Sequence, residues 1–210
     1  SMPLTFLWVL PLLGAAACAV SGSKARYAAL LFSAAFLSAA GALAWIQNTN
    51  SLLSVINEIG PVWAYGVSYR LSADSLSLGL ILLTAFLNLV CVASSWELDV
   101  PAGYWSCFLA LASALTGVFL ARDLFFFYVF WEATLIPMFF IIGLWGSEGR
   151  RHAAMKFFLF TFFGSLFMLV GLLALVTHYH AVSGVWTWDM GKLAGANPTG
   201  LAGLLMFVSL

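Results

Sequence analysis

One acidic side chain lies in the middle of a long apolar segment of this 210-residue sequence. Glu132 comes nine residues after Asp123 and thirteen before Trp145, inside the run Phe-Tyr-Val-Phe-Trp-Glu-Ala-Thr-Leu-Ile-Pro. At that depth in a bilayer a carboxyl costs about 2.5–3.5 kcal/mol, so it must be paired, hydrated or protonated. A carboxyl whose partner moves can change its protonation state, as a proton-relay site requires. Glu132 is therefore the main candidate for chemistry, and a carboxyl satisfied structurally by a neighbouring helix is the alternative.

Lys156 and His178 are the other side chains that we consider for proton transfer. Lys156 follows Arg151 by five residues, so it either extends a polar path or reaches the lipid headgroups. Counted along their helices, Glu132 lies about 20 Å and Lys156 about 8 Å from the same membrane face, so no direct contact is expected. His178 is a weaker candidate for exchanging protons with the outer water. With His180 it lacks a third metal ligand, so an ordinary interfacial histidine is the favoured interpretation.

The composition is typical of a membrane protein. Hydrophobic residues make up 63% and charged residues 8% of the chain, the mean hydropathy is +1.04, and the formal net charge is zero. A soluble domain carries about a quarter charged residues, and a nucleic-acid-binding protein needs a basic face, so both classes are excluded. The three cysteines form no Cys-x-x-Cys pair and are expected to be reduced thiols.

Six complete apolar segments and the start of a seventh predict an all-α, polytopic transmembrane helix bundle. The complete segments are 4–20, 27–46, 75–95, 103–121, 124–145 and 153–178. Each is long enough to cross a hydrocarbon core of about 30 Å. The seventh begins near residue 200 and stops at Leu210, after about 16 Å of helix. We therefore expect the N-terminal part of a longer protein.

The segments divide the chain into regions. These are 1–46 with two helices, 47–73 as an outer loop, 74–121 with two helices, 122–178 with the helices that carry Glu132 and Lys156, 179–199 as a second outer loop, and 200–210. Aromatic and β-branched residues around Gly66 predict a short strand or hairpin at 62–71. Asp74 is expected to cap the third helix, and Arg122-Asp123 to form a local ion pair or cap the fifth.

The basic residues predict how the chain crosses the membrane. One set of loops carries Lys24, Arg26, Arg150 and Arg151, and the opposite set carries Arg70, Arg122 and Lys192. Because cytoplasmic loops are enriched in lysine and arginine, the first set is assigned to the cytoplasm. This predicts a multi-pass membrane protein with its N-terminus on the outer side of the membrane.

Several local sequences together resemble one protein family. They are Ser-Ala-Asp-Ser-Leu-Ser at 72–77, Ser-Trp-Glu at 95–97, Phe-Trp-Glu-Ala-Thr-Leu-Ile-Pro-Met at 130–138, Ala-Met-Lys-Phe-Phe at 154–158, and Gly-Val-Trp-Thr-Trp-Asp at 184–189. In these segments the chain resembles the antiporter-like membrane subunits of respiratory complex I, in particular those of bacterial NADH:quinone oxidoreductase. The resemblance extends over most of the chain.

The resemblance implies a subunit of roughly fourteen helices with two inverted repeats of about five helices each. It implies proton translocation, driven by NADH oxidation and quinone reduction in other subunits. Glu132 matches the family's helix-five glutamate and Lys156 its helix-six lysine, whereas a helix-seven lysine would lie beyond Leu210. No cofactor is expected in this chain; FMN, iron–sulfur clusters, NADH and quinone would be bound by partner subunits. The expected partners are other membrane-arm subunits and the lipid bilayer.

Three alternatives remain open at this point. A subunit of a multisubunit Na⁺/H⁺ antiporter or of a membrane-bound hydrogenase complex would carry the same kind of site. A passive membrane scaffold belongs to another class, and the position of Glu132 argues against it. A membrane-embedded enzyme that uses His178 and His180 lacks a nucleophile or a third ligand.

Overall fold

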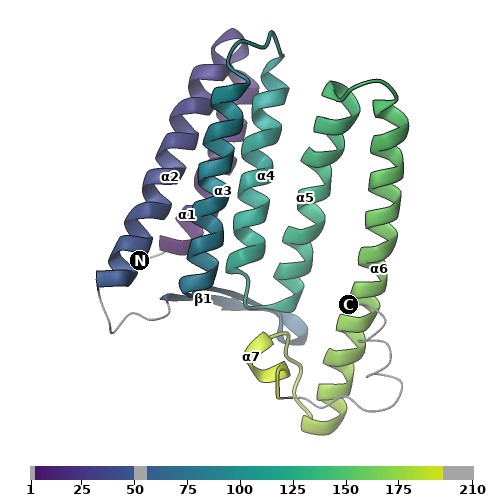
Figure 1. The fold of residues 1–210 in the computed structure, drawn as a ribbon. Helices are drawn as coiled ribbons and strands as arrows, with labels where there is room; N and C mark the ends of the chain where they lie inside the picture. Colours follow the sequence, from purple (N-terminus) through teal and green to yellow (C-terminus); the bar gives the residue numbers. More distant parts are fainter. Residues whose placement is uncertain (1–2, 50–55, 196–210) are drawn as a thin grey trace.

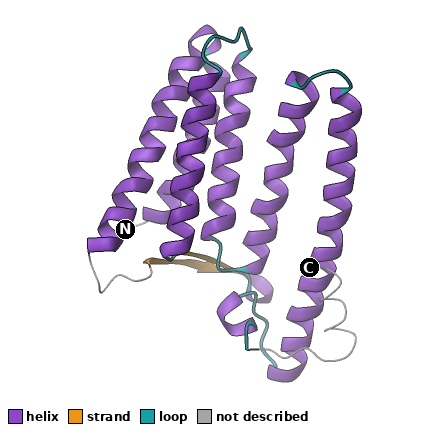
Figure 2. Ribbon diagram, viewed as in Figure 1, coloured by secondary structure: helices purple, strands orange, loops and turns teal. Residues whose placement is uncertain are grey.

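The structure is a computed structural model that describes residues 3–49 and 56–195, where six long helices dominate (Figure 1, Figure 2). The helices are α1 (Pro3–Val20), α2 (Ala25–Thr49), α3 (Ser75–Ser94), α4 (Ala102–Leu120), α5 (Leu124–Trp145) and α6 (Arg150–Ser183). The remaining elements are the strands β1 (Ile56–Val62) and β2 (Ser68–Ala73), the short helix α7 (Met190–Leu193), and the 3₁₀ turns η1 (Gly22–Lys24) and η2 (Ala64–Gly66).

The long helices lie side by side, and the two strands cross one end of the bundle, which we call the hairpin end (Figure 1). Helix α4 packs against α1 and α5, and α2 packs against α1 and α3. Helix α6 packs against α5 and forms the flank of the bundle together with it. The helix that carries Glu132 therefore lies between α4 and α6.

Among the residues that the structure describes, five helices are long and apolar enough to cross a membrane: α2 with η1, α3, α4, α5 and α6. Helix α1 is also apolar but shorter. Large apolar side chains such as Phe160, Phe163 and Phe167 on α6 point away from the rest of the protein, as expected for a surface that meets lipid or another subunit. The predicted transmembrane helix bundle is confirmed, and the chain is a multi-pass membrane protein. The expected seventh segment, 200–210, lies outside the described residues.

Two helices are longer than their apolar segments predict. Helix α2 covers Ala25–Thr49 instead of 27–46, and α6 covers Arg150–Ser183 instead of 153–178. The glycines that flank α6 have positive φ angles of 77° and 73°, and no proline interrupts the helix between them. Its 34 residues span about 51 Å, so α6 extends past the strands at the hairpin end (Figure 1). The helix therefore continues five residues beyond position 178, where the predicted apolar segment ends, so His178 lies inside it.

Small side chains let α4 approach its neighbours closely. On one side, Ser106 and Ser113 each donate a hydrogen bond of 2.7 Å to a backbone carbonyl of α1. On the other side, a side-chain carbon placed on Gly117 would lie 2.2 Å from the ring of Phe130 in α5. Close backbone approach and interhelical hydrogen bonds hold membrane helices together because lipid is as apolar as their side chains. This packing fixes the position of α5 relative to α4.

The strands β1 and β2 pair antiparallel, with Glu58 opposite Leu71. The turn between them contains Tyr65, whose φ is 58°, and Gly66, whose φ is 73°. A side-chain carbon on Gly66 would lie 2.1 Å from the carbonyl oxygen of Trp186, so only glycine fits this close approach. The chain thus forms a hairpin around Gly66 whose first strand begins at Ile56, six residues before the expected segment 62–71.

Glu58 connects the hairpin to the first helix. Its buried carboxylate accepts hydrogen bonds from the backbone N–H groups of Leu4 (3.1 Å) and Thr5 (3.0 Å). The first N–H groups of a helix have no partner within the helix, so a carboxylate at this place stabilises its N-terminus. The hairpin therefore supplies a cap for α1 from a residue far along the chain.

Replacing Glu58 by alanine is expected to destabilise the protein by about 1–2 kcal/mol, since the N–H groups at the start of α1 lose their acceptor. Hydrogen exchange of the Leu4 and Thr5 amides should become faster at the same time. Glu97→Ala is the control, because Glu97 is exposed in the loop between α3 and α4. Equal effects of the two substitutions would show that the cap contributes nothing.

Candidate functional site

Glu132 lies near the middle of α5 and is half-buried. Its carboxyl oxygen Oε1 is fully buried and has no hydrogen-bond partner among residues 3–49 and 56–195. A buried polar atom without a partner is costly, and native structures pair the great majority of such atoms. Glu132 is thus a group that needs a proton, water or a further partner at this depth.

Tyr128 lies one helical turn before Glu132 and near its carboxyl, and Ser165 of α6 lies near Tyr128. The sequence analysis singled out neither hydroxyl group. Ser165 is buried, and its hydroxyl donates a hydrogen bond of 2.8 Å to the carbonyl oxygen of Phe162. The spacing of four residues between Tyr128 and Glu132 was the signal for their nearness. The sequence alone does not reveal the nearness of Ser165, because it depends on the register between two helices.

Lys156 lies on the exposed surface of α6, away from Glu132. The rings of Phe139 and Phe158 are 5.6 Å apart, which sets the register between α5 and α6. Lys156 is then about nine residues from the level of Glu132, or roughly 13 Å along the helix axis. The structure does not bring Glu132 and Lys156 together. This agrees with the expectation, from their depths in the membrane, that they make no direct contact.

The two histidines near the end of α6 lie apart from Glu132. His178 is half-buried in the last turns of the helix. The ring of His180 stacks on Trp186, with 4.0 Å between centroids, and its Nδ1 is buried without a hydrogen-bond partner among the described residues. The part of the chain that the structure describes holds no cluster of three or more metal-binding side chains. The roles expected of Glu132, Lys156 and His178 stay predictions.

A buried carboxylate anchors α5 to the hairpin. Asp123 is fully buried and accepts hydrogen bonds from the Ser68 backbone N–H (2.8 Å), the Ser68 hydroxyl (3.0 Å) and the Phe125 N–H (3.0 Å). Burial raises the pKa of Asp123, and the hydrogen bonds from Ser68 act in the opposite direction. Of the two roles expected for the Arg122-Asp123 turn, Asp123 takes the helix cap.

Ion pairs and backbone hydrogen bonds join the two loops of the hairpin end. Arg70 forms an ion pair with Asp189, and Arg122 forms one of 3.5 Å with Asp74. The N–H of Leu124 donates to a carbonyl of the 184–189 segment at 2.9 Å, and the N–H of Arg122 donates to the carbonyl of Arg70 at 3.0 Å. The start of α5 is therefore held from both sides.

Asp74 caps α3, as expected, through a hydrogen bond of 2.7 Å from the Ser77 N–H. That hydrogen bond, with the charge of Arg122, holds the pKa of Asp74 below its ordinary value of 3.8.

A carboxyl with a lowered pKa stabilises the folded state above its ordinary pKa, and the contribution is lost as the pH falls through the lowered value. We expect the Ser77 amide to lose its protection from hydrogen exchange in that window. Asp74→Asn should remove this pH dependence; an unchanged profile would contradict the role of the cap.

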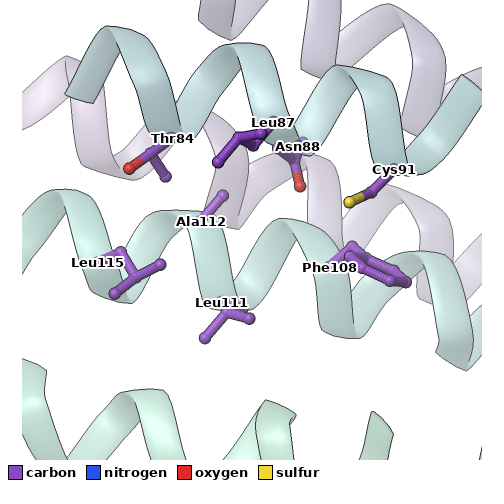
Figure 3. Close-up of a pocket in the computed structure, with 8 residues that line it drawn as sticks. All are labelled: Thr84, Leu87, Asn88, Cys91, Phe108, Leu111, Ala112 and Leu115. Carbon is purple, nitrogen blue, oxygen red and sulfur yellow. The ribbon is translucent and has the colours of Figure 1, made fainter. Parts of the chain in front are cut away.

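A separate pocket of about 170 Å³ lies between α3 and α4 (Figure 3). Its lining is mostly apolar, and its polar side chains include Thr84 and Asn88. The amide of Asn88 donates a hydrogen bond of 2.8 Å to the hydroxyl of Ser33 in α2. No charged residue lines the pocket, and it shares no residue with the surroundings of Glu132, so it is not part of the candidate site.

The comparisons with known proteins agree with this arrangement. Residues 121–210, which include α5 and α6, match the transmembrane family described as NADH:quinone oxidoreductase/Mrp antiporter. The expected resemblance to antiporter-like membrane subunits is confirmed, and Glu132 and Lys156 both lie in the matched part.

Curated relatives of this antiporter-like chain are subunits of redox complexes. NADH-quinone oxidoreductase subunit M of Rhodobacter capsulatus is 46% identical over 114 residues, which cover 54% of this chain and 22% of the relative. F(420)H(2) dehydrogenase subunit M of Methanosarcina mazei is 40% identical over 130 residues, covering 61% of this chain and 26% of that relative. The chain thus spans about a quarter of the length of these curated relatives.

The fold is also that of a solved antiporter-like chain. A chain of respiratory complex I from Thermus thermophilus, solved with bound NADH, superposes with a TM-score of 0.84 at 25% sequence identity. The match covers 98% of this chain and 42% of the other. The hairpin as well as the six long helices therefore falls within the shared fold.

Proposed function

We propose that this chain is part of a proton-translocating membrane subunit of NADH:quinone oxidoreductase, respiratory complex I. The observation that carries the proposal is the buried Oε1 of Glu132, which has no hydrogen-bond partner within the described ranges. Ionisable groups at this depth are costly and are retained mainly for ion or proton pathways. The family match over 121–210 and the similarity to subunit M proteins support the same function.

In this proposal Glu132 gains and loses the transported proton, or sets the proton affinity of a neighbouring lysine. Lys156 extends the polar path toward the cytoplasm, and the gap of roughly 13 Å to Glu132 is bridged by water or by further groups. His178 is a weaker candidate for exchange with the outer water. The family resemblance implies a lysine partner for Glu132 in a seventh helix, beyond Leu210.

The proposed setting is the inner membrane of a bacterium, with the hairpin end and the N-terminus on the periplasmic side. Other membrane-arm subunits of the complex are the proposed partners. NADH, FMN, iron–sulfur clusters and quinone would be bound in those other subunits, and the electron transfer there would drive the protonation cycle at Glu132.

The test is proton pumping in inverted membrane vesicles from cells that lack this subunit. NADH-driven acidification should be absent and should return when the full-length subunit is supplied. Omitting Na⁺ should leave the restored pumping unchanged. A strict requirement for Na⁺ would favour the antiporter alternative, and pumping driven only by reduced F420 would place the chain in a dehydrogenase like that of the Methanosarcina relative.

A further inference from the structure

A polar pocket of about 250 Å³ lies at the hairpin end, between the two strands, the turn from α4 to α5, and α7 (Figure 1). Two arginines, Arg70 and Arg122, line it, and we call it the arginine pocket. We propose that the arginine pocket binds a phosphate group, either as free phosphate or as the headgroup of a phospholipid. The binding is a property of the hairpin end and is separate from proton transfer at Glu132.

The pleat of the hairpin places polar side chains on the face that points away from the helices. Successive side chains of a strand point to opposite faces. Glu58 points toward the bundle, where it caps α1. Its neighbours in β1, Asn57 and Ile59, therefore point the other way, and so do their partners across the hairpin, Ser72 and Arg70. All four of these side chains line the arginine pocket.

Backbone hydrogen bonds hold the walls of the pocket together. The N–H of Arg122 donates to the carbonyl of Arg70 at 3.0 Å, and the N–H of Met190 donates to the carbonyl of Arg122 at 3.0 Å. The turn between α4 and α5 is therefore tied to β2 on one side and to α7 on the other. A pocket whose walls are fixed in this way is largely formed before a ligand arrives, as is usual for binding sites.

Two buried donors that belong to lining residues have no acceptor. The Nε of Arg70 and the hydroxyl of Ser72 are buried and lack a hydrogen-bond partner among residues 3–49 and 56–195. Ser72 as a whole is only 3% exposed. Buried donors of this kind are costly and are rare in native proteins. Rotation about one side-chain bond turns a serine hydroxyl between its staggered positions, so an acceptor in the pocket can be met by this group.

The charged groups of the pocket favour an anion. Its lining contains the guanidinium groups of Arg70 and Arg122 and one carboxylate, that of Asp189. Arg70 uses its Nη1 for the ion pair with Asp189, which leaves its Nε for another partner. Arg122 pairs with Asp74 at 3.5 Å, and the two side chains are 46% and 38% exposed. Exposed ion pairs of this kind contribute little, so a ligand can compete for Arg122.

The donor set suits phosphate better than a carboxylate. Guanidinium groups bind phosphate through paired hydrogen bonds. The available donors come from three side chains, those of Arg70, Ser72 and Arg122, and a phosphate group has enough acceptor oxygens to meet them together. A carboxylate has two oxygens, which a single guanidinium group already occupies. The pocket lies where the membrane-spanning helices end, so lipid headgroups and dissolved phosphate both have access to this level.

The test follows hydrogen exchange of the Arg122 amide in the assembled complex, which contains the full-length subunit. This amide reports on the pocket because its N–H bonds to the Arg70 carbonyl. In detergent solution, inorganic phosphate should slow its exchange in a saturable way, and acetate at the same ionic strength should not. Equal slowing by acetate would overturn the assignment to phosphate.

Ser72→Ala should raise the half-saturating phosphate concentration roughly tenfold, because a hydrogen bond to a charged ligand is lost. Without phosphate it should leave the exchange rate unchanged, since the hydroxyl has no partner within the described ranges. Arg122→Gln should weaken the phosphate effect at least as much. The control is Ser94→Ala, because Ser94 is exposed at the far end of α3. A wild-type response of the Ser72 variant would contradict the proposal.

Reconstituted vesicles distinguish the two sources of phosphate. If the ligand is a headgroup, exchange of the Arg122 amide should be slow in phosphatidylglycerol vesicles and fast in vesicles of an uncharged galactolipid. If the ligand is free phosphate, exchange should be fast in both until inorganic phosphate is added. Fast exchange in both vesicles with phosphate present would overturn the inference. Neither result depends on proton pumping, so the proposed function stands or falls separately.

Discussion

Replacing Glu132 by glutamine is expected to lower NADH-driven proton pumping by on the order of tenfold or more, because a positioned proton-transfer group contributes about 10²–10⁴-fold. Glutamine keeps the size of the side chain and removes its titratable charge. The buried Oε1 has no partner among the described residues, so no ion pair within them is broken by the change. NADH oxidation should fall together with pumping, since the two are coupled.

Two comparisons make this result specific. Glu132→Asp keeps a carboxyl and should retain part of the pumping, with an altered pH profile. Glu97→Gln changes an exposed glutamate in the loop between α3 and α4 and should have no effect. The complex must stay assembled in each variant, as judged by its migration on a native gel. Normal pumping by an assembled Glu132→Gln complex would make Glu132 a structural carboxyl and would favour the scaffold.

Replacing Gly66 by alanine is expected to detach the hairpin from the 184–189 segment. The added methyl group would lie 2.1 Å from the carbonyl oxygen of Trp186, which is backbone and cannot turn away. The residue also has a φ of 73°, which strains any side chain larger than hydrogen. Such a combination costs more than about 2 kcal/mol. The thermal unfolding temperature of the purified subunit or complex should fall accordingly.

Gly79→Ala is the matched control, because Gly79 lies in α3 and nothing is within 4 Å of its added carbon. Alanine favours a helix over glycine by about 1 kcal/mol, so this variant should be neutral or slightly more stable. Limited proteolysis after Tyr65 gives a second readout, since its carbonyl accepts a hydrogen bond of 3.2 Å from the Trp188 indole. Equal stability of the two variants would mean that the hairpin does not dock as the structure describes.

The sequence was sufficient to predict the elements that are determined by residues close together in the chain, such as apolar runs and helix caps. Apolar runs of about 20 residues give transmembrane helices wherever they occur, and Glu132 was identifiable because a charge is conspicuous in such a run. Asp74 and Asp123 were identifiable as helix caps from their places before apolar runs. Lys156 was expected to make no direct contact with Glu132, because rise per residue fixes depth along a helix.

The contacts between distant segments could not be predicted in this way. Glu58 caps α1 through the N–H of Leu4, 54 residues earlier, and no local pattern marks that pairing. The nearness of Ser165 to Tyr128 depends on the register of α5 against α6, which is set by packing. The predicted end of α6 was too early, because it was placed where the apolar segment ends. The helix continues to Ser183 and stops only before Gly184, which has a positive φ angle.

The anchoring of α5 at one end determines how that helix can move. Asp123 and the backbone around it are tied to the hairpin and to the 184–189 segment, whereas at Trp145 the helix continues into the short connection 146–149. A rod clamped at one end pivots but does not slide. Glu132 lies nine residues from this anchored end on a helix of 22 residues, and at the other end the ring of Trp145 packs against Tyr104 of α4 with 5.2 Å between centroids. In a tilt of α5 about its anchored end, Glu132 would move less than half as far as Trp145. A force applied near Trp145 would therefore act as on a lever. It would produce a large displacement near Trp145 and a smaller displacement, with a larger force, at the Glu132 carboxyl.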